Sequence, residues 1–172
     1  HYAYIEASIN GTGYPSKTGS LVGIFNLKSD SILQFAYHMW AATEEEEKEL
    51  FPTEVPPYYN VVDDQTFKVF IKYNAEDDYI ETFSKTGNHG NHWNLVSLPI
   101  SAGDTVYIKF TGTTSSEEYI VDDTFSGGWQ SDIALDYIKI FPKTHTVYQL
   151  EYNPDVGNYG TISLTYNGFN SN

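Results

Sequence analysis

The chain has 172 residues, and its 9 lysines against 23 aspartates and glutamates leave a formal net charge of −14 at pH 7. This charge repels phosphate backbones and anionic membrane surfaces, and no run of 18 apolar residues occurs, so we expect neither nucleic-acid binding nor membrane insertion. The absence of cysteine excludes disulfides, cysteine-ligated metals and thiol catalysis. An aromatic content of 16% is too high for a disordered acidic tail.

Alternation of apolar and polar residues with a period of two dominates the chain and predicts β-strands. In chain order, the expected strands are Tyr2–Ser8, Ser20–Phe25, Ser31–Met39, Thr66–Asn74, Tyr79–Lys85, Asn91–Leu98, Thr105–Thr111, Ile133–Phe141, Thr146–Tyr152 and Thr161–Tyr166. Turn sequences such as Asn10-Gly11 and Gly127-Gly128 separate them. Short strands with short connections predict an all-β fold, an antiparallel two-sheet β-sandwich or jelly roll.

The longest gap between the expected strands runs from Ala41 to Asp64. Within it, Thr43–Leu50 predicts a short helix, because Thr43 and Glu46 form a capping box and Pro52 ends the segment. Loops of more than ~15 residues are uncommon in compact domains and are often functional. A solvated insertion without a function is the alternative.

A domain boundary is expected at Pro142-Lys143-Thr144, so we predict one domain over residues 1–142. Residues 143–172 hold two further strand patterns, but so short a segment cannot build its own core. They form either an extra β-hairpin or the start of a neighbouring domain. The chain begins at His1 without a secretion signal, so we expect a mature protein or a piece of a longer one.

Five segments, in order, resemble the MAM domain, an extracellular jelly-roll module. The first, Tyr2-Ala3-Tyr4-Ile5-Glu6-Ala7-Ser8, matches the opening motif of that family. The others are Leu33–Trp40, Phe67–Ile71, Gly87–Trp93 and Ser131–Ile138. The resemblance implies a two-sheet antiparallel jelly roll and a non-catalytic, extracellular binding or adhesion role.

The chain departs from the animal members of that family in two ways, by the absence of disulfides and by the long insertion. Both features fit a bacterial MAM-like module, which typically sits beside a catalytic or adhesive domain in a secreted protein. We therefore expect a secreted accessory module that is covalently linked to neighbouring domains.

Three acidic residues form a candidate calcium site: Glu6, Asp132 and Asp136. Asp132 and Asp136 have the same parity on a strand, so their side chains point to one face. First and last strands of jelly rolls often pair, which would bring Glu6 to them. Calcium binds clustered oxygen ligands and would relieve the repulsion between carboxylates. The resemblance to the MAM domain also implies a structural cation near these strand ends, as in related jelly rolls. Ordinary edge carboxylates are the alternative.

Aromatic residues in loops suggest a carbohydrate ligand, because flat rings cover the apolar faces of sugars and Tyr and Trp add a polar edge. The candidate ligand-binding residues are Trp129, Tyr58, Tyr59, Trp40, His89 and His92. We expect Trp93 to belong to the core and Tyr2 and Tyr4 to be partly buried.

The leading interpretation is binding of a polysaccharide or other glycan, without catalysis, because the chain lacks a nucleophile elbow and a zinc-protease motif. With no arginine and a charge of −14, a neutral glycan is the easier ligand. A sulfated glycan would need a lysine cluster drawn from Lys68, Lys72, Lys85 and Lys109. The alternative function is a protein–protein adhesion or spacer module with no glycan ligand.

Overall fold

The structure is a computed structural model of the chain. It describes residues 2–7, 16–41, 49, 64–116 and 131–143, and the backbone of four short strands at 119–121, 124–126, 149–152 and 162–165. The chain divides into two compact units, His1–Pro142 and Lys143–Asn172, which are described separately. In the described part of the chain, no helix has the length and apolar character needed to cross a membrane.

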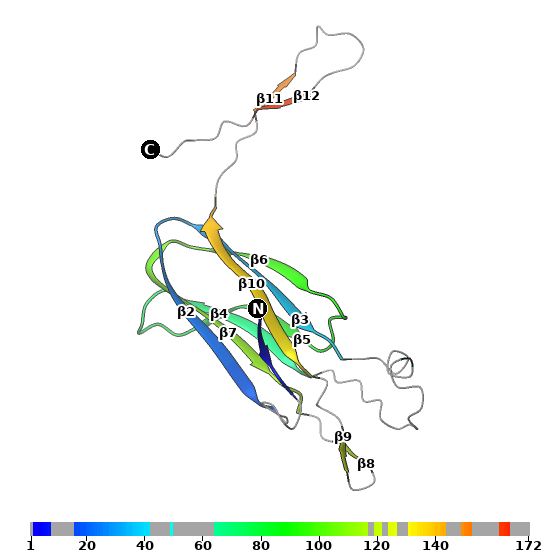
Figure 1. The fold of residues 1–172 in the computed structure, drawn as a ribbon. Coiled ribbons are helices and arrows are strands. Elements are labelled where there is room, and N and C mark those ends of the chain that lie inside the picture. The colour runs from blue at the N-terminus through cyan, green and yellow to red at the C-terminus, as the bar shows by residue number, and fades with distance from the viewer. Residues whose placement is uncertain are drawn as a thin grey trace. The chain divides into compact units, whose positions relative to one another are not determined.

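The first unit contains two four-stranded antiparallel sheets that face each other (Figure 1). From edge to edge, sheet A contains β1 (Ala3–Ile5), β10 (Ile133–Pro142), β3 (Ser31–Met39) and β6 (Asn94–Ile100). Sheet B contains β2 (Thr18–Leu27), β7 (Gly103–Thr113), β4 (Thr66–Lys72) and β5 (Ile80–Thr86). The predicted fold class, an all-β antiparallel sandwich, is confirmed. The predicted helix lies outside the described residues, apart from Glu49.

The core lies between the sheets because alternate residues of each strand point inward. The buried core residues are Leu27, Leu33, Phe35, Tyr37, Met39, Phe67, Val69, Ile71, Ile100, Val106, Ile108, Phe110, Ile133 and Leu135. Phe35 is central, with its ring centre 5.9 Å from that of Phe67, 5.5 Å from Phe83 and 5.4 Å from Phe110. Full burial of such a side chain stabilises the fold by about 1.5–3 kcal/mol.

Most strand bounds follow the alternation, and β3 has the predicted bounds. In contrast, β6 begins three residues later than predicted. The reason is a turn in which Gly87 and Gly90 have positive φ angles of 83° and 82°, and in which the His92 amide donates to the Gly90 carbonyl at 2.9 Å. The alternation also did not predict β8 (Tyr119–Val121) and β9 (Thr124–Ser126), which pair with each other.

Strand β10 contains a bulge where its register with β3 shifts between Asp136 and Lys139. Tyr137, inside the bulge, has a φ of 56°, in the left-handed region that side chains other than glycine rarely adopt. The Tyr137 amide donates to Oδ1 of Asp136 at 2.6 Å. The extra residue places the Tyr137 side chain on the exposed outer face of sheet A.

In the second unit, β11 (Gln149–Tyr152) and β12 (Ile162–Thr165) pair as antiparallel strands. The two interpretations of residues 143–172, an extra hairpin or the start of a neighbouring domain, both stay predictions.

Candidate functional site

The outer face of sheet A carries exposed aromatic rings. Tyr2 is 59% exposed, Tyr4 58%, Trp93 43% and Tyr137 46%. Together with the half-buried His38, we call these residues the aromatic patch. Exposed apolar side chains scattered singly are ordinary, whereas a contiguous group marks an interaction surface. The aromatic patch is therefore the candidate functional site.

Four rings of the aromatic patch contact one another across the sheet. The Trp93 ring centre lies 5.8 Å from that of Tyr2 and 5.6 Å from that of His38. The Tyr2 and Tyr4 ring centres are 5.9 Å apart, with the ring planes inclined at 58°. Tyr4, Tyr2, Trp93 and His38 therefore form one connected group of rings.

Small residues make this contact possible. Trp93 directly precedes β6, at one edge of sheet A, whereas Tyr2 directly precedes β1, at the other edge. Between them, the outward residues of β3 and β10 include Ala36 and Ala134, which the strand register places opposite Asp136 and His38. Larger side chains at these two positions would fill the space that the indole needs.

A hollow of about 290 Å³ lies beside Trp93, and we call it the Trp93 hollow. It is lined by Ala36, Trp93, Leu95, Asp136 and Tyr137. Leu95 is exposed, Ala36 forms a buried floor, and the Asp136 carboxylate adds a polar group to an otherwise apolar lining. One face of the Tyr137 ring is covered by the Lys139 ammonium group, 3.8 Å from the ring centre.

Polar side chains surround Trp93. Nε2 of His38 lies 3.2 Å from Oδ1 of Asn91, and the Asn94 amide group donates to the carbonyl of His92 at 3.2 Å. The side chains of Asn91 and His92 are exposed. The patch thus combines apolar rings with amide and imidazole groups that can hydrogen-bond a ligand.

The predicted ligand-binding residues lie in several places. His92 is exposed next to Trp93. His89 is half-buried, with its ring centre 5.7 Å from that of Tyr37 and its Nε2 3.2 Å from the Thr86 carbonyl. Trp40 is half-buried, and its indole nitrogen has no acceptor among the described residues. Trp129, Tyr58 and Tyr59 lie outside the described residues.

The expectation that Trp93 belongs to the core is wrong, because Trp93 lies on the outer face of sheet A. Sequence reasoning also missed Tyr2, Tyr4 and Tyr137 as site residues. Tyr2 and Tyr4 alternate along the strand in step with the charged Glu6, so all three side chains lie on one face. The charge of Glu6 indicates that this face points outward. No comparable signal exists for Tyr137, because its exposure depends on the bulge.

Two of the three predicted calcium ligands are neighbours. Strand β1 pairs with β10 in antiparallel orientation and aligns Ile5 with Ile133. Continuing this register by one residue places Glu6 opposite Asp132. Oδ1 of Asp132 accepts a hydrogen bond from the Ala7 amide at 2.7 Å. Burial raises the pKa of Asp132 above its usual 3.8, the Ala7 hydrogen bond lowers it, and the negative charge of Glu6 raises it again, with a net increase.

Asp136 lies apart from this pair, in the Trp93 hollow. It is four residues beyond Asp132 on the same strand, which corresponds to about 13 Å. Within the described ranges, no three His, Asp or Glu side chains gather in a way that could hold a metal ion. The raised pKa of Asp132 beside Glu6 fits a cation, but the pair supplies only part of the six to eight oxygens that calcium takes.

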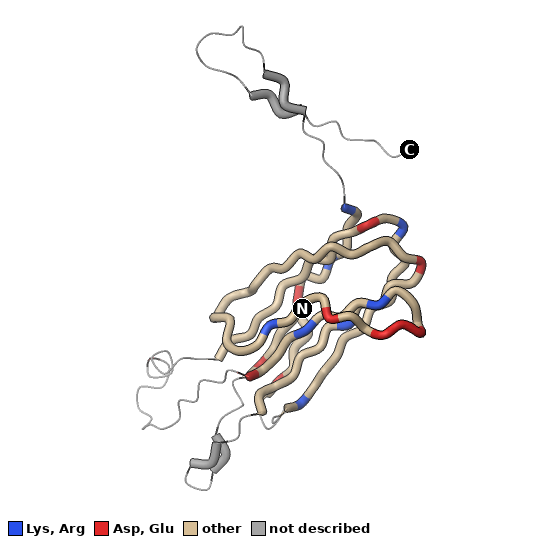
Figure 2. The backbone as a smooth tube through the Cα atoms, turned by 180° about the vertical axis from the view of Figure 1, so that it is seen from behind, with Lys and Arg blue, Asp and Glu red and all other residues tan. Residues whose placement is uncertain are grey.

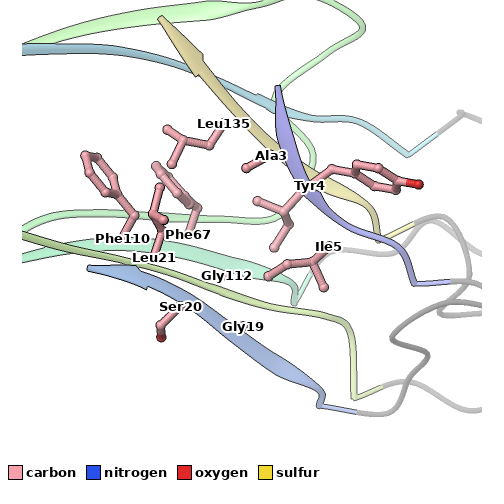
Figure 3. Close-up of a pocket in the computed structure, with 11 residues that line it drawn as sticks. Ala3, Tyr4, Ile5, Gly19, Ser20, Leu21, Phe67, Phe110, Gly112 and Leu135 are labelled. Atoms are coloured by element: carbon pink, nitrogen blue, oxygen red, sulfur yellow. The ribbon is translucent and has the colours of Figure 1, made fainter. Parts of the chain in front are cut away.

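A second hollow, of about 320 Å³, opens between the two sheets at the edge formed by β1 and β2 (Figure 3). Most of its lining residues are apolar, among them Ile5, Leu21, Phe67, Phe110 and Leu135. Figure 3 shows Ile5 pointing toward Gly112, while Tyr4 points away from the hollow. Among its lining residues, Ser20 and Tyr4 are the two with polar side chains, so we assign this hollow to the packing of the sheet edge.

No family model matches the chain. Among solved structures, the chain is similar to a protein described as "Family 16 Carbohydrate Binding Module-2", with a TM-score of 0.37 and 9% sequence identity. This similarity covers 81% of this chain and 84% of that chain. A TM-score below 0.5 supports no inference on fold or ligand.

Proposed function

We propose that the chain is a non-catalytic carbohydrate-binding module and that the aromatic patch on sheet A is its binding face. The observation that carries the proposal is the connected group of exposed rings, Tyr2, Tyr4 and Trp93, beside the Trp93 hollow. Exposing these rings to water loses the free energy that their burial would provide. A ligand with an apolar face restores part of it.

Sugars suit this surface because a pyranose ring has a C–H face and a rim of hydroxyl groups. The C–H face would stack on Trp93 or Tyr2, whose rings are inclined at 65° to each other. The hydroxyl groups would bond to Asp136, Asn91 and His92, which lie around the same rings.

The charges around the patch favour a neutral sugar. Glu6, Asp132 and Asp136 lie on the same outer face, and the ammonium group of Lys139 is already placed against the Tyr137 ring. A carboxylated or sulfated sugar would be repelled by these acids. We therefore propose that the ligand of the aromatic patch is an uncharged polysaccharide.

Calcium and cellular location form the second part of the proposal. We propose that Glu6 and Asp132 contribute to a structural calcium site. From the MAM-like motifs, we propose that the module belongs to a secreted, multidomain bacterial protein. The calcium proposal is supported by the proximity of the two carboxylates and by the raised pKa of Asp132.

Affinity gel electrophoresis against neutral polysaccharides tests the function. We expect retardation of the full chain by at least one of β-glucan, xylan or galactomannan. Trp93→Ala should raise the Kd about tenfold or more, because a central aromatic contact is typically worth at least ~1.4 kcal/mol. Phe25→Ala, which removes a ring at the exposed edge of sheet B, serves as the matched control and should bind like the wild type.

The proposal fails if no polymer retards the wild type, or if Trp93→Ala binds as tightly as Phe25→Ala. An exposed group of rings also suits contact between proteins, the adhesion alternative. Sedimentation velocity separates the two: dimers that form with rising concentration and vanish in Trp93→Ala would favour adhesion.

A further inference from the structure

The outer face of sheet B carries lysines among aromatic rings. Outward residues of neighbouring strands lie in rows across the sheet: one row joins Val22, Lys109, Phe70 and Glu81, and the next joins Ile24, Tyr107 and Lys72. We call the group Lys68, Lys72, Lys109, Phe70, Tyr79 and Tyr107 the lysine face. The remaining predicted member of a lysine cluster, Lys85, is opposite the buried Phe67 and so has the other parity.

Aromatic rings hold two of the ammonium groups in place. Nζ of Lys109 lies 4.2 Å from the centre of the Tyr79 ring and 4.8 Å from that of Phe70. Nζ of Lys72 lies 5.0 Å from the centre of the same Tyr79 ring and 4.9 Å from that of Tyr107. Such contacts are attractive, and they fix the two charges near one ring.

The third lysine of the lysine face, Lys68, is neutralised by an ion pair. Nζ of Lys68 forms an ion pair with Glu81 at 2.8 Å. Lys72 donates to the Ala75 carbonyl at 2.5 Å, and within the described ranges neither Lys72 nor Lys109 forms an ion pair. Two like charges held beside one ring repel each other, and an anion between them would replace this repulsion by attraction.

Acidic side chains also lie nearby, in the turn between β4 and β5. Glu76, Asp77 and Asp78 are exposed there, and the Asp77 carboxylate accepts a hydrogen bond from Asn74 at 2.8 Å. Because they are exposed at the end of the strands, dissolved salt screens their charges at distances beyond about 8 Å at physiological ionic strength. Figure 2 shows acids and lysines interspersed along the described backbone rather than separated into halves.

Hydroxyl groups complete the face. Ser20 and Thr111 form a hydrogen-bonded pair at 3.0 Å in the row next to Lys109, and Thr18 and Thr113 form another, also at 3.0 Å. Hydroxyl groups, aromatic rings and point charges together match a sugar that carries an acidic group. Nucleic acid fits less well, because the chain as a whole has a charge of −14.

We infer that the lysine face is a second binding site, distinct from the aromatic patch, and that it binds an anionic sugar through Lys72 and Lys109. The ammonium groups contact a carboxylate or sulfate group of a pyranose, and the Ser and Thr hydroxyls bond to its ring substituents. Lysine suits either anion as a point charge, whereas arginine would be needed for a bidentate contact.

The test is affinity electrophoresis of the full chain in three cellulose derivatives that share a backbone: hydroxyethyl cellulose, carboxymethyl cellulose and cellulose sulfate. Polygalacturonate and methyl-esterified pectin repeat the comparison on a second backbone. We expect retardation by the charged polymers that weakens with added NaCl. Lys72→Gln/Lys109→Gln should raise the Kd for them roughly five- to thirtyfold.

The matched control is Lys17→Gln/Lys28→Gln, which removes the same charge from two exposed lysines outside the lysine face and should change little. Trp93→Ala should not alter binding to the anionic polymers, which separates this inference from the proposed function. Retardation by the carboxylated polymers alone identifies carboxylate as the preferred anion, and retardation by cellulose sulfate alone identifies sulfate. Equal effects of the two double variants, no retardation by any anionic polymer, or equal retardation by neutral and charged forms would overturn the inference.

Discussion

Asp132 shows how one residue can couple stability, pH and cation binding. Its pKa is raised, mainly by burial and also by the charge of Glu6, so the folded chain holds a proton more tightly than the unfolded chain. Stability from this group is therefore present at low pH and decreases as pH rises above the ordinary value of 3.8 toward the raised value. A bound cation would reverse this loss at neutral pH.

We predict that Asp132→Asn removes both effects. In EDTA, the variant should be at least as stable as the wild type at pH 7. The uncharged amide oxygen can still accept the hydrogen bond from the Ala7 amide, and the repulsion between the two carboxylates at positions 6 and 132 is removed. Calcium should raise the melting temperature of the wild type but not that of Asp132→Asn. Thermal melting from pH 4 to pH 7, with calcium or EDTA, measures both effects.

Asp136→Asn is the control for that experiment, because Asp136 lies in the Trp93 hollow. It should keep the calcium response. A wild-type melting temperature that is the same in calcium and in EDTA would contradict the calcium proposal. A calcium response that Asp136→Asn abolishes would instead require a site beyond the Glu6–Asp132 pair.

At the scale of the element, β1 is a three-residue edge strand whose position depends on glycine in the opposite sheet. A Cβ atom on Gly112 of β7 would lie 2.6 Å from Cδ1 of Ile5, and one on Gly19 of β2 would lie 2.9 Å from the same atom. These two glycines therefore leave the space into which Ile5 inserts between the sheets.

We predict that Gly112→Ala destabilises the first unit by about 1 kcal/mol, at the lower end of the range for overpacking, because the neighbouring hollow lets Ile5 move. Ile5→Val lacks the clashing Cδ1 atom. Adding Gly112→Ala to Ile5→Val should therefore lower the free energy of unfolding by much less than Gly112→Ala does in the wild type. Urea denaturation of the four proteins in this cycle gives the coupling free energy. Additive effects would show that Ile5 and Gly112 do not share this space.

At the scale of the whole molecule, the main electrostatic feature is the net charge of −14. Self-repulsion of this size opposes the compact state, and salt screens it. We predict that raising NaCl from about 20 to 300 mM at pH 7 increases the melting temperature.

The same salt series at pH 4.5 is the control, because the sequence pI is about 4.5 and the net charge is then close to zero. The salt effect should largely disappear there. An equal increase at both pH values would point to a general salt effect on hydrophobic burial rather than to charge screening.

Much of the strand pattern could be predicted because it depends on local alternation. In β3, inward residues such as Phe35 alternate with outward ones such as Gln34, and the predicted bounds agree with the observed ones. The start of β6 could not be predicted from the alternation of apolar and polar residues. It depends on a turn that the positive φ angles of Gly87 and Gly90 allow. The closeness of Glu6 to Asp132 followed from pairing of the first and last strands.

The sequence by itself therefore determined the fold class and the inward and outward faces of most strands, because the parity of residues along a strand is a property of the chain. Tertiary structure alone decided that Trp93 reaches Tyr2 across Ala36 and Ala134, that a bulge exposes Tyr137, and that Lys72 and Lys109 share the Tyr79 ring. Trp93 and Tyr2 are far apart in sequence, as are Lys109 and Tyr79, and strand order and register bring each pair together.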